Sequence, residues 1–189
     1  MIRIAIVGDI GSGKSFISNL FKQPVFNADL EVVNIYKKNK SCFAKIKKKI
    51  PNQFSSFPIK KEELIGSILA DKNNLKKISN IVHPIVRRRL DNFLKKNKNK
   101  KIVILDIPLY FENKLNKKKD IVIYIEARKE KILYHLKKRN NFNLSLINQF
   151  RSLQYSQKYK KKKSDFIIKN DYKIRTVKNN VKLILKKLR

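Results

Sequence analysis

The sequence predicts an α/β fold, a parallel sheet of about five strands flanked by helices. Short apolar, β-branched runs alternate along the chain with longer segments in which apolar residues recur at helical spacing. Nearly continuous apolar strands are typical of parallel sheets covered on both faces. The chain has 189 residues, of which 42% are hydrophobic, enough for a sizeable core. We therefore expect one domain spanning residues 1–189.

The N-terminal elements follow from this alternation. Residues 2–7 (IRIAIV) form an apolar run that stops at Gly8, which predicts a buried strand. We expect a helix over 14–22, a second strand over 24–29 and a helix over 30–48 with lysines on its outer face. The glycine-rich segment after the first strand therefore connects a strand to a helix.

The middle of the chain has a helical pattern. Residues 51–58 lie between two prolines and predict a loop. Apolar spacing then indicates helix from 59 to 97, interrupted at His83-Pro84, because the residue before a proline avoids the helical region. A new helix is expected to begin at Pro84, which suits a first helical turn.

The C-terminal part continues the alternation of strands and helices. Its strands are expected at the start of 101–113, ending at Asp106, and at 120–127 and 164–170, with helices over 128–163 and 173–188. Ligands of parallel sheets bind at the carboxyl ends of the strands, so the residues just after each strand are the candidates for function.

Residues 8–15, Gly-Asp-Ile-Gly-Ser-Gly-Lys-Ser, satisfy the phosphate-binding pattern GxxxxGK[ST]. Glycines let the backbone turn tightly and bring its N–H groups against phosphate oxygens, and the following helix adds its positive end. Lys14 would bridge the β- and γ-phosphates of ATP, and the Ser15 hydroxyl would bind Mg²⁺. An ordinary strand–helix turn explains the glycines but not the Lys-Ser pair. The motif predicts a P-loop NTPase fold. The residues expected to bind the nucleotide are Gly8, Ile10, Gly11, Ser12, Gly13, Lys14, Ser15 and Phe16.

Two carboxylates follow predicted strands. Asp106 resembles a Walker B acid and is a candidate catalytic residue, a candidate contact of the substrate and a second candidate ligand of Mg²⁺. It could equally cap the strand end or pair with a lysine. Asp29 is placed to accept the proton of an acceptor hydroxyl in a small-molecule kinase, although it could also be the N-cap of a helix over 30–38.

Cationic side chains near the predicted site are further candidates. Arg139 follows a helix beginning at Arg128 and suits a lid over the leaving phosphates, so we expect a lid region over 128–145. Arg87 could meet substrate phosphates, or it could belong to the exposed face of helix 84–97. His83 is a further candidate for the substrate site, although a histidine before a proline is more often a structural turn residue.

The net charge of +33 raises the question of nucleic-acid binding. The basic residues are mostly lysines spread along the whole chain rather than arginines and aromatics gathered in one patch, so we interpret the charge as compositional drift. A nucleic-acid-binding ATPase is the alternative from another class. A single cysteine, no signal segment and no long apolar stretch favour a cytoplasmic location without a membrane partner.

Several segments together resemble the dephospho-coenzyme A kinase family. They are GDIGSGKS at 8–15, NAD at 27–29, LKKISNIVHPIVRRRL at 75–90, LDIPLYFEN at 105–113 and SDFIIKND at 164–171. The resemblance covers almost the whole chain in order, and the HP and PLYFE segments discriminate this family from other P-loop kinases. A P-loop kinase acting on another nucleoside or small metabolite is the alternative within the same class.

The resemblance implies ATP-dependent, Mg²⁺-assisted phosphorylation of the ribose 3′-hydroxyl of dephospho-CoA, giving CoA and ADP. It implies that Asp29 is the base, that Arg139 is the lid arginine, and that the helices over 59–97 form a CoA-side lobe. The partners implied are ATP and dephospho-CoA.

Four positions depart from the family pattern. Asp9 stands where the family usually has glycine, and an acid beside bound phosphates is unfavourable unless its side chain points outward. Asn27 replaces the first Asp of the DAD segment, Val33 replaces an arginine, and His135 replaces the first arginine of the lid. These departures put in question nucleotide affinity and part of the substrate site.

Overall fold

The computed structural model describes residues 1–139 and 142–188. The chain forms two compact units, which are described separately. The first, here the sheet unit, contains residues 1–27 together with those from 97 onward. The second, here the helical unit, contains residues 28–96. The helical unit thus contains residues 59–96 of the predicted 59–97 lobe and also residues 28–58 before it.

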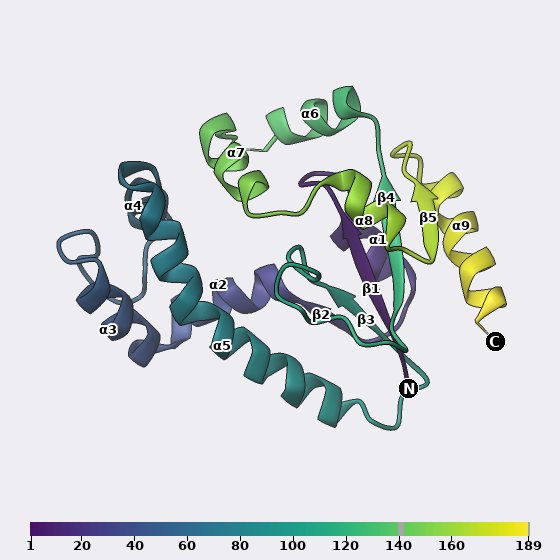
Figure 1. Cartoon of the computed structure of the whole chain (residues 1–189), viewed down its shortest axis with the longest axis horizontal. Coiled ribbons are helices and arrows are strands. Elements are labelled where there is room, and N and C mark those ends of the chain that lie inside the picture. Colours follow the sequence, from purple (N-terminus) through teal and green to yellow (C-terminus); the bar gives the residue numbers. More distant parts are fainter. Residues whose placement is uncertain (140–141, 189) are drawn as a thin grey trace. The chain divides into compact units, whose positions relative to one another are not determined.

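The sheet unit is built on five parallel strands in the order β2-β3-β1-β4-β5 (Figure 1). The strands are β1 (Ile2–Gly8), β2 (Val25–Asn27), β3 (Ile102–Asp106), β4 (Ile121–Glu126) and β5 (Phe166–Lys169). This confirms the α/β class and the parallel sheet. The strand β2 is shorter than predicted, because it ends at Asn27 rather than at Asp29.

Helices pack on the sheet through side chains that alternate along its strands. On one face Ile4 and Ile6 of β1 join Ile104, Ile123 and other residues in a core with α1 (Lys14–Leu20) and α9 (Ile174–Lys187). The intervening residues of the strands, such as Ala5 and Leu105, are buried on the opposite face. Burial of both faces explains why the strands are apolar without interruption.

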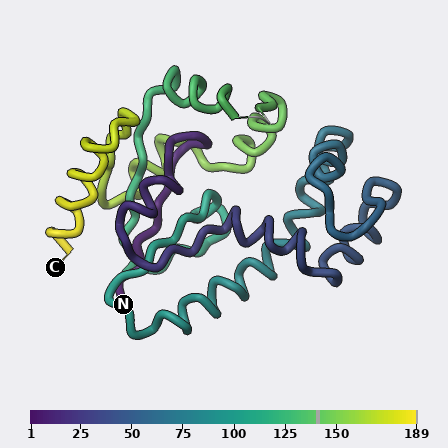
Figure 2. Tube along the Cα trace, turned by 180° about the vertical axis from the view of Figure 1, so that it is seen from behind, coloured from purple at the N-terminus to yellow at the C-terminus, as the bar shows by residue number. Residues whose placement is uncertain are grey.

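Three further helices of the sheet unit lie in the predicted helical region 128–163. They are α6 (Lys129–Lys137), α7 (Leu144–Ser152) and α8 (Gln157–Lys162). Figures 1 and 2 show α6 and α7 at the end of the sheet where β1 leads into the glycine-rich loop. The functional segment after β1 is therefore close to elements that come more than 100 residues later in the chain.

The helical unit contains α2 (Ala28–Lys38), α3 (Lys40–Lys49), α4 (Lys61–Ala70) and α5 (Lys72–Lys96), and α5 contacts the other three. The predicted single helix over 30–48 is wrong, because Asn39 interrupts it. The Asn39 backbone is extended, and its side chain accepts a hydrogen bond from the Cys42 N–H at 2.9 Å, which begins a new helix.

The predicted break at Pro84 is also wrong, because α5 is one helix of 25 residues with Pro84 in its interior. Proline removes one helical hydrogen bond, but the apolar stripe of α5 remains buried before and after it, at Val82 and Leu90. The interruption lies instead at Asp71, between α4 and α5, where the carboxylate accepts from the Asn73 N–H at 2.8 Å. Tertiary packing thus overrides the local preference of the proline.

A buried ion pair holds the segment after β3 to α8. Lys160 is fully buried, and its ammonium group donates to Glu112 at 3.0 Å, to the Gln154 side chain at 2.9 Å and to the Pro108 carbonyl at 3.2 Å. The three donors of the ammonium group are therefore satisfied by three acceptors. The pair fixes the segment that follows Asp106.

Replacing Glu112 with alanine should destabilise the protein by about 3 kcal/mol, because it leaves the buried Lys160 charge without its counter-ion. Denaturant unfolding followed by circular dichroism measures the change. Glu126→Ala is the matched control, since it breaks a more exposed pair with Lys161 and should cost less than about 1 kcal/mol. Equal destabilisation by the two variants would contradict this account.

Candidate functional site

The loop between β1 and α1 is held from outside through its carbonyl oxygens. The Asn170 side-chain amide donates to the Ser12 carbonyl at 2.8 Å, and the Tyr172 hydroxyl donates to the Gly11 carbonyl at 2.9 Å. The N–H groups of the first turn of α1 have no carbonyl partner within the helix. With its carbonyls engaged elsewhere, the loop leaves these N–H groups as the donors for an anion.

Gly13 is required by the geometry of this loop. Its φ of 92° lies in the left-handed region, which side chains other than glycine rarely adopt. A Cβ atom there would lie 2.4 Å from the Asn170 side-chain nitrogen, the group that holds the Ser12 carbonyl. The glycine therefore permits both the turn and the contact that supports it.

Lys14 is buried and reaches back across the loop. Its Nζ donates to the Asp9 carbonyl at 2.8 Å and to the Gly8 carbonyl at 3.2 Å. The ammonium group is thus positioned inside the loop by backbone acceptors, as expected for a lysine that meets phosphates in the same space. Lys14, in the first turn of α1, can reach the Gly8 and Asp9 carbonyls because the tight turn of the loop brings them close to the start of the helix.

Ser15, Asn27 and Asp106 come together at the carboxyl ends of β2 and β3. Asn27 and Asp106 are paired across the two strands, and the Asn27 amide donates to Asp106 Oδ2 at 2.6 Å and to Ser15 Oγ at 3.4 Å. Asp106 is 2% exposed. The structure therefore connects the predicted serine and acid through Asn27, one of the four departures from the family pattern.

The oxygens of Ser15 and Asp106 fit a magnesium ion. Mg²⁺ prefers oxygen ligands, and it is usually bound by one or two protein groups, several waters and substrate phosphates. Within residues 1–139 and 142–188, no three His, Cys, Asp or Glu side chains gather as a metal site. A small set of protein oxygens beside a phosphate-binding loop agrees with that mode of binding.

Asp9 is paired with an arginine. Arg151 of α7 donates to both of its carboxylate oxygens, from Nε to Oδ1 at 3.1 Å and from Nη2 to Oδ2 at 3.0 Å. The Ile10 N–H also donates to Asp9 Oδ1, at 2.7 Å. The acid that is unexpected in a phosphate-binding loop is therefore neutralised by a residue 142 positions away. The predicted nucleotide contact of Ile10 stays a prediction, with its N–H engaged by Asp9.

Arg139 follows α6 and is exposed. Burial raises the pKa of Tyr172, the Arg139 charge lowers it in part, and the Asp9 charge raises it further. Arg139 and Asp9 therefore both lie within electrostatic range of Tyr172, whose hydroxyl binds the loop. Residues 140 and 141 of the predicted lid region lie outside the described residues.

His135 also belongs to this region. Its ring stacks on that of Tyr172 at 4.0 Å between centroids. Leu136, the next residue of α6, would lie 2.8 Å from a Cβ atom placed at Gly11. The part of the predicted lid region that α6 forms is thus packed beside the phosphate-binding loop.

The remaining predicted residues lie in the helical unit. Asp29 is exposed in the first turn of α2, which begins at Ala28, so the alternative that Asp29 is the N-cap of a helix over 30–38 is wrong. Its role as the base stays a prediction. His83 and Arg87 lie one turn apart on α5, and burial followed by the Arg87 charge lowers the pKa of His83. Arg87 is exposed, whereas Arg89 pairs with Glu31 at 2.7 Å and holds α2 to α5.

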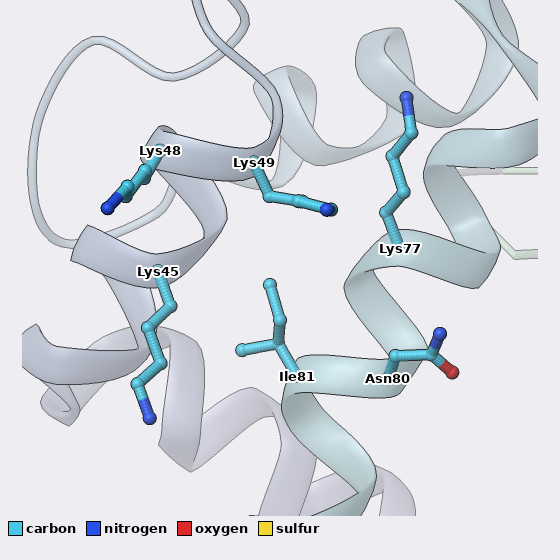
Figure 3. Close-up of a pocket in the computed structure, with 6 residues that line it drawn as sticks. All are labelled: Lys45, Lys48, Lys49, Lys77, Asn80 and Ile81. Atoms are coloured by element: carbon cyan, nitrogen blue, oxygen red, sulfur yellow. The ribbon is translucent and has the colours of Figure 1, made fainter.

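The helical unit also has a pocket between α3 and α5, lined by lysines (Figure 3). Ile81 points into the pocket and Lys49 extends across it, whereas the amino groups of Lys45, Lys48 and Lys77 point away from the centre. Lysines that line a pocket with their stems and hold their charges in water are usual at protein surfaces. The arrangement agrees with the interpretation that the excess of lysine reflects the overall composition of the chain.

Sequence reasoning missed the residues that support the loop. Asn170 and Tyr172 follow β5, and only their position after a strand could have suggested that they contact the loop. Nothing in the sequence indicated that Arg151 contacts the loop, because Asp9 is distant in sequence and most basic residues of this chain are solvated. No helix in the described part of the chain combines the length and hydrophobicity needed to cross a membrane.

The comparisons with known proteins agree on one family. The family model described as dephospho-CoA kinase matches residues 2–176. A dephospho-CoA kinase of Wolbachia pipientis is 34% identical over 170 residues, which are 87% of each chain. The structure of TT1252 from Thermus thermophilus is similar with a TM-score of 0.79 and 25% identity, covering 100% of this chain and 98% of that one. A dephospho-CoA kinase from Campylobacter jejuni has the same fold, with a TM-score of 0.66, 22% identity and coverage of 98% and 96%.

Replacing Gly13 with alanine should abolish measurable ATP binding, because the new Cβ would displace Asn170 and the residue would resist its positive φ. Isothermal titration with ATP measures the effect. The matched control is Gly66→Ala in α4, where an added Cβ meets no described atom within 4 Å, and binding there should be unchanged. Normal ATP binding by the Gly13 variant would contradict the account of the loop.

Proposed function

Since the chain belongs to the dephospho-CoA kinase family, we propose how its residues transfer a phosphoryl group from ATP to dephospho-CoA. The reaction phosphorylates the ribose 3′-hydroxyl and gives CoA and ADP, the last step of CoA biosynthesis. The observation that carries this proposal is the assembled loop, in which Lys14 lies inside the turn and Ser15 and Asp106 lie beside it. A cytoplasmic location remains a prediction from the sequence.

The loop binds the phosphates of ATP. The N–H groups of Gly11 and of residues 13–16, with the ammonium group of Lys14, supply the positive groups, whereas the Ser12 N–H donates to the Asp9 carbonyl within the loop at 3.2 Å. The carbonyl contacts of Asn170 and Tyr172 keep the loop in shape. Because these donors are fixed before the nucleotide arrives, little reorganisation is needed when negative charge develops on the transferred group. Lys14 exchanges the Gly8 and Asp9 carbonyls for phosphate oxygens.

Ser15 and Asp106 would hold Mg²⁺. When bound there, the ion would supply positive charge beside the phosphates of ATP. Asn27 donates to both protein groups and so keeps the Asp106 carboxylate turned toward Ser15.

The oxygen of the ribose 3′-hydroxyl attacks the γ-phosphorus, and Asp29 accepts the proton of this hydroxyl. The exposed position of Asp29 in the first turn of α2 leaves the carboxylate accessible to a substrate. The bond between the γ-phosphorus and the bridging oxygen breaks in the same step, and ADP leaves with the electron pair. Arg139 stabilises the charge that develops on the phosphates, and closure of the 128–145 region excludes water.

His83 and Arg87 bind dephospho-CoA. They share one face of α5, so a histidine and an arginine are presented together to an anionic substrate. Their contacts add to substrate affinity, whereas Lys14 and Asp29 act on the reacting groups.

A coupled assay with ATP, Mg²⁺ and dephospho-CoA tests the proposed function. We expect equal amounts of ADP and CoA, and mass spectrometry should find the new phosphate on the ribose. A panel of nucleosides and small metabolites should give much lower kcat/KM. Absence of turnover by the folded protein, or a better acceptor in the panel, would refute it.

Replacing Lys14 with alanine should lower kcat/KM by about 10²–10³-fold, the usual effect of removing one group that stabilises developing charge. Steady-state kinetics with dephospho-CoA measures the loss. Lys182→Ala, on the exposed side of α9, removes the same charge elsewhere and should leave kcat/KM unchanged. A Lys14 variant with near-wild-type kcat would exclude the assigned role.

Replacing Asp29 with asparagine should lower kcat strongly while ATP binding is retained, because the amide cannot take a proton from the 3′-hydroxyl. Kinetics and ATP titration together separate these effects. Asp91→Asn on α5 is the control for loss of an exposed carboxylate in the helical unit. An unchanged kcat for Asp29→Asn would mean that the base is another group.

A further inference from the structure

The phosphate-binding loop carries a negative charge that its chemistry does not require. Asp9 lies between Gly8 and Gly11, and its backbone carbonyl accepts from Lys14, the residue that meets the phosphates. A carboxylate in this position repels the anion that the loop binds. The sequence gives no reason for the loop to tolerate it.

Arg151 removes this repulsion. Its guanidinium binds the Asp9 carboxylate through two roughly parallel hydrogen bonds of 3.1 and 3.0 Å, the geometry in which arginine binds carboxylates most specifically. The Asp9 side chain is 18% exposed and that of Arg151 is 37% exposed, so water screens the pair only partly. The Ile10 N–H adds a second hydrogen bond to Asp9 Oδ1, at 2.7 Å.

The contact joins two elements that no other feature of the sequence connects. Asp9 belongs to the loop, whereas Arg151 lies in the last turn of α7, beyond the predicted lid region. The pair therefore anchors α7 at the loop, beside the contacts that α6 makes with Gly11.

We propose that Asp9 and Arg151 form a positioning pair for nucleotide binding. Arg151 neutralises Asp9 so that the loop keeps its attraction for phosphate, and Asp9 holds Arg151 and α7 in place. Arg151 acts through Asp9 and does not itself bind the nucleotide. The inference rests on the proposed function in one respect, that the loop binds the phosphates of ATP.

The proposal predicts suppression of one variant by another. Arg151→Gln leaves the Asp9 carboxylate uncompensated beside the phosphates and should weaken ATP binding by about tenfold. Adding Asp9→Asn removes the same charge and should restore affinity to within about twofold of the wild type, because no charge is then left unpaired. Arg151→Lys keeps the positive charge without the paired hydrogen bonds, and its affinity for ATP should lie between those of Arg151→Gln and the wild type.

The experiment is a titration of Mg²⁺-ATP by isothermal calorimetry into the wild type, Arg151→Gln, Arg151→Lys and the double variant Arg151→Gln/Asp9→Asn. Thermal unfolding of each protein verifies that it is folded. Arg175→Gln on α9 and Asp91→Asn on α5 are matched controls for loss of each charge at an exposed position, and both should bind ATP normally.

Kinetics then separate positioning from a structural defect. Arg151→Gln should raise the KM for ATP and leave the KM for dephospho-CoA nearly unchanged, whereas a damaged fold would also lower the thermal stability and alter both constants. The ATP titration needs no acceptor, so it reports on the pair even if the protein phosphorylates another substrate. Loss of the proposed function would appear instead as absence of turnover in the wild type.

Two outcomes would overturn the proposal. If the double variant binds ATP as weakly as Arg151→Gln, then Arg151 contacts the nucleotide directly and Asp9 is irrelevant to its role. If Arg151→Gln binds ATP as tightly as the wild type, the charge on Asp9 does not affect the loop. Restored affinity in the double variant supports the pair.

Discussion

The parallel register of the sheet is the constraint on which the rest of the site depends. Because β1, β2 and β3 run in the same direction, the loop after Gly8, the amide of Asn27 and the carboxylate of Asp106 arrive at one edge. The apolar strands that enforce this register are the same residues that form the core. Binding chemistry is therefore concentrated at strand ends, where polar groups need not be buried in the core.

Support for the loop comes from late in the chain. Asn170 and Tyr172 bind loop carbonyls, and Arg151 neutralises Asp9, so residues after position 150 fix the shape and the charge of residues 8–13. Two departures from the family pattern acquire a physical meaning in this way. Asn27 bridges Ser15 and Asp106, and Asp9 has a compensating partner. The structure offers no comparable account of Val33, which is exposed on α2.

The sequence predicted the sheet, the loop and the main chemical groups, because strand periodicity and the GxxxxGK[ST] spacing are local signals. It failed where tertiary contacts outweigh local preference: α5 continues through Pro84 because its apolar stripe is buried on both sides. Asn39 ended a helix that periodicity alone extended, since a capping side chain competes with helix continuation. The Asp9–Arg151 pair could not be predicted, because one arginine among many cations carries no signal of its partner.

The central claim is that one preformed loop binds the phosphates of ATP while Asp29 activates the acceptor. A crystal structure with Mg²⁺, a non-hydrolysable ATP analogue and dephospho-CoA tests it most directly. The account predicts β- and γ-phosphates against the N–H groups of Gly11 and residues 13–16, with Lys14 moved onto them and Asp29 within hydrogen-bond distance of the ribose 3′-oxygen. Phosphates bound elsewhere, with Lys14 still on the Gly8 and Asp9 carbonyls, or a 3′-oxygen far from Asp29, would contradict it.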